Sequence, residues 1–591
     1  MRTILLSLSL FLSVASIAQV GDTLKRPSDS TRIDTLKTID SLKAFADTAK
    51  KADTFLIVDS IKWKTTINNS DSINLAGTSA TIDTKIKTDS TKTTDSLLTT
   101  AHVADSSLAN ISPNADSTKL TDSLVEVMDS TASQKEEKPL TNKYGDLLND
   151  DPKYNPKYPW LLPAGRVLLT DVTNWAADRY IFNYDWSRIS PSTWRYNIQK
   201  GWEWDNDRFG INFIGHPYSG SYYFNVGRSN GYNFWQSFPF AVEGSLIWEY
   251  FGENTRPSIN DIINTPISGA FLGEIMYRVS SNILDDRTRG GQRFFREFLA
   301  AIVDPPRALN RLTQGKMFRV TPTEVYQKEP MNITLYTGIH KVNNKDGSNN
   351  KFGTGGTNAV LQMQIDYGDP FEVIQRKPYD VFRGRIELGY GFNKYLISTI
   401  NGYGLLAGKT VKEDRLLVGL FQHFDYWHNN IFEVGSIGFG GGLISKIHSG
   451  EHSNIYSNIH LAVVPLAGNN TRFGPDTSDY RFYNFGGGLE GKMEETLNVN
   501  NWLSLGFTGF YYWIHTYDGI PGNSLVGILK PTIAVKLFKN VSVGFEHHIY
   551  HNDRYISGFI NKTPDLHITR TEQKLYLQFF FENSKRSGKY H

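Results

Sequence analysis

The sequence contains no cysteine in its 591 residues. Disulfides therefore cannot stabilise the fold, and no cysteine is present to carry a lipoprotein anchor. The formal net charge is only +2. Nucleic acid is not an expected partner, because binding to phosphate depends on a basic surface. A large chain without disulfides has to be held together by packing or by a sheet that closes on itself.

Long apolar segments are also absent. No stretch after residue 18 reaches the roughly 20 apolar residues that a transmembrane helix needs. Residues 1–18 combine Arg2, a short apolar run over residues 4–14, and the small residues Ser16 and Ala18. This pattern predicts a signal peptide that is cleaved after Ala18, with an uncleaved anchor as the alternative. Any crossing of a membrane therefore has to be made by strands.

Residues 19–142 have few aromatic and glycine residues and many Asp, Ser, Thr and Lys residues. Such a segment cannot bury enough apolar surface to offset its chain entropy, so we expect a disordered tether. Asp followed by Ser or Thr and then by an apolar residue or Thr recurs along it, and this repeat resembles the O-glycosylation acceptor site of the Bacteroidetes group of Gram-negative bacteria. A solvated tether with local side-chain turns is the alternative. The candidate acceptors are Thr23, Ser30, Thr35, Ser41, Thr48, Thr54, Ser60, Ser72, Ser90, Ser96, Ser117, Ser123 and Ser130.

Residues 143–331 introduce Trp, Tyr and Pro together, which indicates the start of a folded region, a helical insert. We predict a short strand or turn at residues 216–218, a helix at residues 239–250 that begins with a proline, and a turn at residues 253–257. A second helix is predicted to follow, capped by Ser258 with Asp261 at capping-box spacing.

The second predicted helix carries two further signals. Gly269 and Gly273 stand four residues apart, which would let another backbone approach closely. Pro266 should kink the helix, because proline removes a backbone hydrogen bond.

Three strings stand out in this region: "HPY" from His216, "WEY" from Trp248, and "RPSINDIINTPISG" from Arg256. Through them the region resembles a family of exported Gram-negative proteins catalogued as a domain of unknown function, DUF3943. The resemblance covers roughly residues 200–312, and the family implies no established activity. A fainter likeness to VanZ-like membrane proteins lies in the last of these strings.

Six residues are candidates for a catalytic or ligand site: His216, Ser229, Glu249, Glu253, Asp261 and Glu274. Neighbouring carboxylates beside an imidazole suit general acid-base chemistry. A buried polar clamp is the alternative, in which Arg256 bridges Glu253 and Asp261 while His216 closes a turn. Ser229 also completes a GxSxG pattern after the strand-like "SYYFNV", as a nucleophile would; a glycine-bounded turn is the alternative.

Residues 332–583 contain roughly twelve segments in which apolar and polar residues alternate, as in "FRGRIELGYGF". We therefore predict a mainly β fold, an antiparallel transmembrane β-barrel of about twelve strands, followed by a polar tail at residues 584–591. A soluble sandwich would alternate too. Aromatic residues near the segment ends favour the membrane, as in interfacial girdles.

The polar face of the predicted strands should line the lumen, and we expect the helices to plug or cap it. His547 and His551 would lie about 13 Å apart at the strand rise, so we expect no metal site there, and we expect no cofactor. The predicted lumen-lining residues are Arg383, Arg385, Glu387, Arg415, Asp425, Glu546 and Lys574.

These patterns predict an outer-membrane protein of the transport or envelope-structural class, with the tether in the periplasm or at the cell surface. The alternative is a membrane-embedded enzyme that acts on envelope lipid or glycan through His216 with Glu249 or Glu253. The expected partners are outer-membrane lipid and the barrel-assembly machinery, with envelope glycan as a further candidate.

Overall fold

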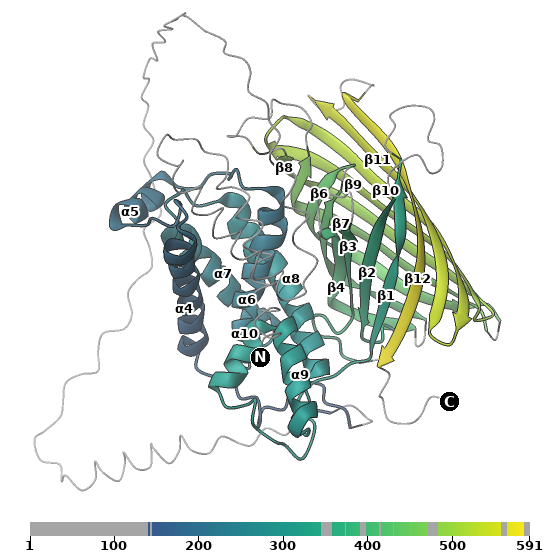
Figure 1. Cartoon of the computed structure of the whole chain (residues 1–591), viewed down its shortest axis with the longest axis horizontal. Coiled ribbons are helices and arrows are strands. Elements are labelled where there is room, and N and C mark those ends of the chain that lie inside the picture. The colour runs from purple at the N-terminus through teal and green to yellow at the C-terminus, as the bar shows by residue number, and fades with distance from the viewer. Residues whose placement is uncertain are drawn as a thin grey trace, which may run out of the picture. The chain divides into compact units, whose positions relative to one another are not determined.

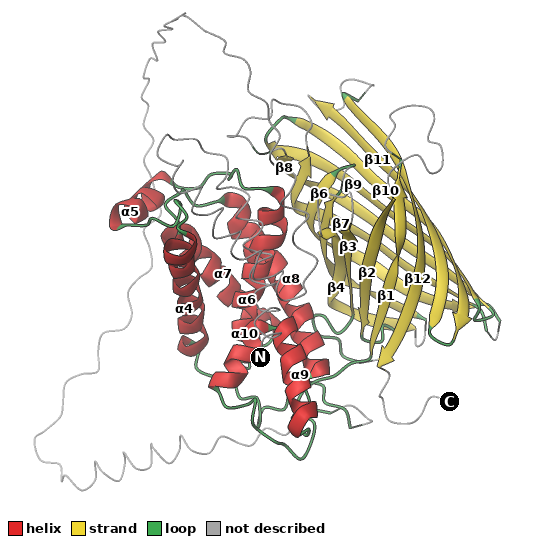
Figure 2. Cartoon of the chain, in the orientation of Figure 1, coloured by secondary structure: helices red, strands yellow, loops and turns green. Residues whose placement is uncertain are grey.

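The computed structural model describes residues 140–141, 145–343, 357–372, 374–390, 397–412, 415–429, 431–450, 452–470, 481, 483–556 and 564–583. The predicted signal peptide, the candidate glycosylation sites and the polar tail lie outside the described residues. Helices and strands form two successive parts of the chain (Figures 1 and 2).

The first part is helical, with seven α-helices in the described residues. Three π-helical turns interrupt the series: η2 (Asp178–Phe182), η3 (Ile211–Gly215) and η4 (Trp248–Gly252). No helix of the described chain is long and apolar enough to span a membrane. The α-helices are α4 (Leu161–Ala177), α5 (Pro191–Lys200), α6 (His216–Ser229), α7 (Phe234–Ile247), α8 (Ile259–Ile283), α9 (Gly290–Val303) and α10 (Pro305–Thr313).

Local capping signals explain where several of these helices begin. Ser258 caps α8 as predicted, and its side chain accepts a hydrogen bond from the backbone N–H of Asp261. The predicted start at Pro239 is wrong, because Asn233 forms a capping box with Gln236 and α7 begins five residues earlier. Pro266 lies inside α8.

The prediction of a strand or turn at residues 216–218 is wrong, because these residues open α6. Pro217 stands in the first turn of that helix, where a missing backbone donor is tolerated. The strand-like "SYYFNV" is likewise helical. The close approach predicted for Gly269 is confirmed, because a methyl group there would overlap the backbone of Gly220 on α6.

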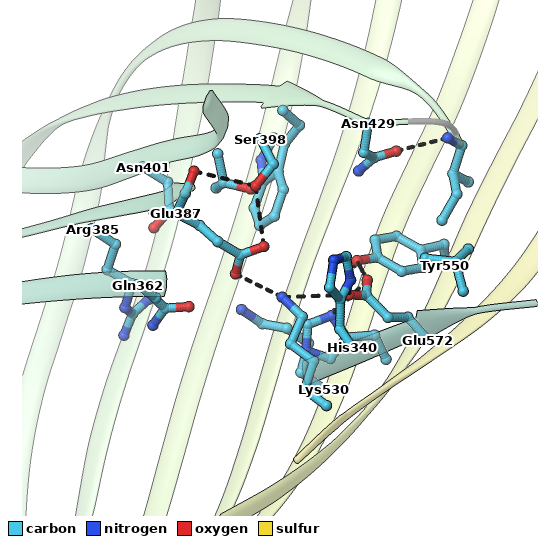
Figure 3. A pocket seen from close by; sticks show the side chains of 16 residues that line it. His340, Gln362, Arg385, Glu387, Ser398, Asn401, Asn429, Lys530, Tyr550 and Glu572 are labelled. Carbon is cyan, nitrogen blue, oxygen red and sulfur yellow. Dashed lines mark hydrogen bonds and ion pairs between the residues drawn. The ribbon is translucent and has the colours of Figure 1, made fainter. Parts of the chain in front are cut away.

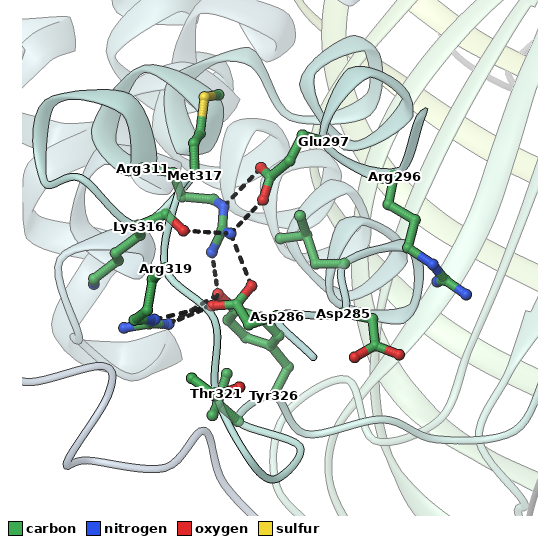
Figure 4. A network of polar contacts seen from close by, with 12 residues as sticks. Asp285, Asp286, Arg296, Glu297, Arg311, Lys316, Met317, Arg319, Thr321 and Tyr326 are labelled. Atoms are coloured by element: carbon green, nitrogen blue, oxygen red, sulfur yellow. Dashed lines mark hydrogen bonds and ion pairs between the residues drawn. The ribbon is translucent and has the colours of Figure 1, made fainter. Parts of the chain in front are cut away.

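A network of ion pairs holds the C-terminal end of the helical part together (Figure 4). The Arg311 guanidinium on α10 lies 2.6 Å from a Glu297 carboxylate oxygen on α9 and 2.9 Å from an oxygen of Asp286. Arg319 bonds the same Asp286 carboxylate at 2.6 Å. The network ties α9, α10 and the segment after them to the end of α8.

The second part is a closed barrel of twelve antiparallel strands, as predicted. Each strand pairs with its neighbours in sequence, and β1 closes the barrel by pairing with β12. The strands are β1 (Met331–Val342), β2 (Thr357–Tyr367), β3 (Phe382–Tyr390), β4 (Ile397–Lys412), β5 (Leu416–His428), β6 (Glu433–His448), β7 (Asn454–Asn470), β8 (Tyr483–Val499), β9 (Leu503–Asp518), β10 (Gly522–Phe538), β11 (Val541–Ile556) and β12 (Leu566–Asn583).

Ion pairs between distant strands identify the inner face of the barrel. Arg385 on β3 lies 2.5 Å from Glu494 on β8, and Lys574 on β12 lies 2.6 Å from Glu387 on β3. Such pairs can form only across the interior, because other strands separate their elements in the sheet. The alternate residues on the same strands therefore point outward.

The outward residues form an exposed apolar surface over much of the barrel. On β7, Leu461 is 67% exposed and Val463 is 59% exposed, and Leu489 follows beside them on β8. An apolar outer face with charged residues inside is the arrangement of a transmembrane barrel rather than of a soluble sandwich.

The helical part packs against the outer wall of the barrel and not in its lumen. Phe271 of α8 stacks near Phe424 at 5.6 Å between ring centroids, and it also covers Gly402. Phe213 lies over Gly435 and Gly468. The strand residues that these rings contact are Phe424, Gly402, Gly435 and Gly468. They alternate with the residues of the interior ion pairs and therefore face outward. The expectation that the helices plug or cap the lumen is wrong. The outward glycines leave the room that the aromatic side chains occupy.

Leu461 offers a direct test of the outward face. Replacing it by Arg is expected to lower the free energy of unfolding by about 2–4 kcal/mol, because a charge near the bilayer midplane loses its hydration. Urea unfolding of the barrel in lipid vesicles measures this loss. Ile447, beside the end of β6, is the control, and the same change there should cost about 1 kcal/mol or less. Equal losses at both positions would contradict the assignment.

Candidate functional site

A buried polar cluster lies where the start of α6, the start of α8 and the loop before η3 meet. Three of its side chains, Asn212, Asn260 and Asp261, are at most 3% exposed. Its members, referred to below as the polar cluster, are Asp205, Asn212, His216, Ser258, Asn260 and Asp261.

The first turn of α8 builds one side of the polar cluster. Ser258 donates from its hydroxyl to Asn260 Oδ1 at 2.8 Å and accepts from the backbone of Asp261 at 3.2 Å. The backbone N–H of Ser258 donates to Glu249 Oε2 at 2.7 Å. Glu249 therefore caps the entry to α8 from the preceding π-helical turn, where it is 5% exposed.

Two asparagine amides orient the two aspartates. Asn212 donates to Asp205 Oδ1 at 2.9 Å, and Asn260 donates to Asp205 Oδ2 and to Asp261 Oδ1, both at 2.9 Å. Asn264, one turn further along α8, donates to the backbone carbonyl of Asn212. These contacts fix both carboxylates without supplying a positive charge.

His216 faces the carboxylates from the first residue of α6. Its Nε2 lies 3.4 Å from Asp261 Oδ1, and its Nδ1 lies 3.4 Å from the Thr265 hydroxyl. Asp205, His216 and Asp261 each present one ligand atom, and these atoms lie within 4.8 Å of one another.

Burial shapes the protonation of the site. It raises the pKa of Asp261 well above the ordinary aspartate range, and the nearby Asp205 raises it further. Burial also raises the pKa of Glu249, with Glu253 as the next cause, and it lowers the pKa of His216. Among the described residues, no Lys or Arg forms an ion pair with Asp205, Glu249 or Asp261. Burial therefore disfavours the charged forms of Glu249, Asp261 and His216.

The predicted clamp is wrong in its bridging residue. Arg256 pairs with Glu203 at 2.7 Å and donates to backbone carbonyls of residues 200–202, so it does not reach Asp261. Glu253 instead accepts from the Trp248 indole at 2.7 Å and from the Thr255 hydroxyl at 2.9 Å. His216 opens a helix rather than closing a turn.

Glu274 lies in a separate network on α8. It is fully buried and accepts from Arg228 of α6 at 2.7 Å and from Arg278 at 2.8 Å. Arg278 continues to Asp380, just before β3, at 2.9 Å. Glu274 thus joins two helices to the barrel, away from the polar cluster.

Ser229 does not occupy a nucleophile elbow. It ends α6, and its hydroxyl donates to the backbone carbonyl of Asn225 in the same helix. The interpretation as a nucleophile is wrong, because a helix precedes the serine where the motif requires a strand.

The lumen of the barrel is filled by charged side chains (Figure 3). Lys574 lies 2.6 Å from Glu387 and 3.6 Å from Glu572, and His340 lies 2.5 Å from the same Glu572. Lys530 lines the small cavity between them, whose volume is about 40 Å³.

Most of the predicted lumen residues take part in these interior contacts. Arg383 and Arg385 both pair with Glu494, at 2.6 and 2.5 Å. Asp425 pairs with Lys492 of β8, and Glu546 lies 2.7 Å from His548. Arg415 is different: it is exposed in the turn before β5, because the strand begins one residue later.

Several functional residues were not predicted. Glu490, Lys492 and Glu494 face the lumen from β8, and their alternation in "LEGKMEETL" is the same signal that identified β3. Asp205 and Asn212 lie within the recognised region, but neither was singled out, because neither has a local signal of its own. Only the fold brings them to α8.

The polar cluster falls entirely within residues 201–306, which match one family model. The match is to the Domain of unknown function (DUF3943). No curated protein matches the chain. The match ends at the second residue of α10, so it covers α6–α9 and none of the strands of the barrel.

The chain is also similar in fold to solved structures that include porins and an outer-membrane protein. The NanC porin is 9% identical, with a TM-score of 0.24 over 42% of this chain and 98% of its own. OmpT of Vibrio cholerae is 10% identical, with a TM-score of 0.21 over 43% of this chain and 100% of its own. An anion-selective porin from Comamonas acidovorans is 8% identical, with a TM-score of 0.21 over 43% and 100% of the two chains.

Proposed function

We propose that this protein is an outer-membrane barrel of the envelope-structural class, with a lumen closed to solutes. In this proposal the barrel anchors the DUF3943 helices against its outer wall, where they contact outer-membrane lipid. The barrel-assembly machinery would insert the strands, and the tether would lie in the periplasm or at the cell surface.

The single observation that carries this proposal is the pairing of charges across the lumen. The pairs join β3 to β8 through Glu494, β12 to β3 through Lys574, and β8 to β5 through Lys492. The cavity lined by Lys530, about 40 Å³, has room for only a few water molecules. A solute could pass only if several buried ion pairs separated, which is costly because each would leave uncompensated charges.

The helical part also presents apolar side chains to its surroundings. Leu168 and Leu169 on α4 are 48% and 63% exposed, and Phe294 and Phe295 on α9 are 54% and 63% exposed. Exposed apolar surface of this kind favours contact with lipid. Because these helices are too short to span, we infer that they lie along the membrane, as amphipathic interfacial helices do.

Conductance measured in planar lipid bilayers tests the closed lumen. We expect the intact protein to insert without a steady ion current. The comparison variant replaces both Glu387 and Lys574 by Ala, which removes one cross-lumen pair and also takes away the cation beside Glu572, and it should produce a measurable current. A steady current through the unaltered protein would instead support the transport class.

An enzyme that acts on envelope lipid or glycan is the second candidate. The specific observation in its favour is the polar cluster, where the His216 imidazole faces two carboxyl groups and burial raises the pKa of Asp261 and lowers that of His216. Such a set can exchange a proton with a substrate. The Glu249 variant described in the Discussion separates this candidate from a structural role.

A further inference from the structure

We propose that Asp205, His216 and Asp261 form a binding site for one divalent transition-metal ion. The site would lie inside the polar cluster, between the loop before η3 and the first turns of α6 and α8. The site would support the envelope-structural role proposed above, but the observations that indicate the site are separate from those that indicate that role.

The spacing of the three ligand atoms fits a metal ion. They lie within 4.8 Å of one another, and His216 Nε2 is 3.4 Å from Asp261 Oδ1. Ligands held about 2.1 Å from a tetrahedral ion are themselves about 3.4 Å apart. The observed separation is too long for a good hydrogen bond between the two side chains.

The buried ring nitrogen of His216 points to the same conclusion independently. Its Nε2 is enclosed by protein and makes no hydrogen bond within the described chain, although the side chain as a whole is 15% exposed. A buried polar atom without a partner costs free energy, so such atoms usually have a ligand. The Thr265 hydroxyl lies 3.4 Å from the opposite ring nitrogen, Nδ1.

The charge balance of the cluster also favours a cation. Two carboxylates, Asp205 and Asp261, face one space. In the described part of the chain no Lys or Arg forms an ion pair with either carboxylate, and the nearby cation, Arg481, donates to the backbone carbonyl of Asp205. Asn212 and Asn260 hold those carboxylates by donating to them. Outer-shell donors of this kind are typical of metal sites.

The ligand types indicate the class of metal. An imidazole suits Zn²⁺, Cu²⁺, Fe²⁺ or Ni²⁺, whereas Ca²⁺ and Mg²⁺ are bound mainly through oxygen. One imidazole with two carboxylates therefore favours a transition-metal ion.

The location suggests what the ion would do. Asn212 donates to the Tyr483 hydroxyl at the start of β8 at 2.6 Å, and Arg481 donates to the backbone carbonyl of Asp205. An ion at the site would fix the segment that contacts the barrel to the starts of α6 and α8. Binding should therefore raise the thermal stability of the helical part.

Calorimetric titration of the chelator-treated, full-length protein in detergent tests the site, with Zn²⁺ and Co²⁺ as probes. We expect one tight site in the unaltered protein and binding weaker by about tenfold or more in the His216→Ala variant. The control is His567→Ala, because His567 belongs to the other group of His and Asp side chains, with His551 and Asp553. The tight site should survive that change.

Two further measurements keep the result independent of folding. The Asp205→Asn variant changes a half-buried ligand, and it should weaken binding while the circular dichroism spectrum stays unchanged. Bound Co²⁺ should produce a visible absorption spectrum that both ligand variants lose, and it should raise the melting temperature of the unaltered protein only. Absence of tight binding, or tight binding that the folded variants retain, would overturn the proposal.

Discussion

Replacing Glu274 by Gln is expected to cost the helical part about 3–5 kcal/mol of its free energy of unfolding. The carboxylate is fully buried and compensates two guanidinium groups, those of Arg228 and Arg278. Arginine cannot lose its proton in a protein, so the variant leaves both charges buried with too little compensation. Thermal unfolding followed by circular dichroism at helical wavelengths measures the loss, and the helical signal should disappear well before the strand signal.

Glu249→Gln is the matched control on the neighbouring π-helical turn. Glu249 has no cationic partner, and a glutamine can keep the carbonyl oxygen that accepts from Ser258. We expect a loss of about 1 kcal/mol or less. Equal destabilisation by the two variants would contradict the distinction between the network and the polar cluster. A stable Glu249→Gln protein that fails to restore the envelope phenotype of a deletion strain would support the enzyme candidate.

Replacing Glu494 by Gln is expected to destabilise the barrel by a similar amount, about 3–5 kcal/mol. Glu494 compensates both Arg383 and Arg385 from the opposite side of the lumen, so the change leaves two guanidinium groups beside a neutral amide. Unheated folded barrels migrate differently from heated ones in detergent gels. The temperature at which the folded band disappears should therefore fall in the variant.

Glu495, the next residue on β8, supplies the control for this prediction. It is on the opposite face of the strand, and its carboxylate is bonded by the Ser457 hydroxyl rather than by a cation. Glu495→Gln should leave the transition temperature almost unchanged. A Glu494→Gln barrel that is as heat-resistant as the Glu495→Gln barrel would show that the interior pairs contribute little.

The barrel could be predicted from sequence because its signal is local. In β3, Arg383 and Arg385 alternate with Gly384 and Ile386, and a strand places alternate residues on opposite faces whatever lies nearby. What covers each face is not a local property. Gly402 and Gly435 look like breaks in an apolar face, and only the packed structure shows that aromatic side chains of the helices fill them.

In the candidate site, too, local features could be predicted from the sequence and long-range contacts could not. The cap formed by Ser258 and Asp261 was predictable because both residues belong to one helical turn. The helical state of "SYYFNV" was not, because it depends on the contact between Gly220 and Gly269 on another helix. Asp205 comes close to Asp261 only when α8 packs beside the loop before η3, so the spacing of the two residues along the chain does not predict the pair.

The packing of the helices on the outer wall has a consequence for how the protein is made. Residues 161–313 are synthesised before β1, which begins at Met331, yet Phe213 and Phe271 pack on residues of β4–β7. That surface exists only after the strands have paired. We therefore expect the barrel to fold before the helices, although the helices are synthesised first. A periplasmic chaperone would keep the helices soluble until they pack on the finished barrel.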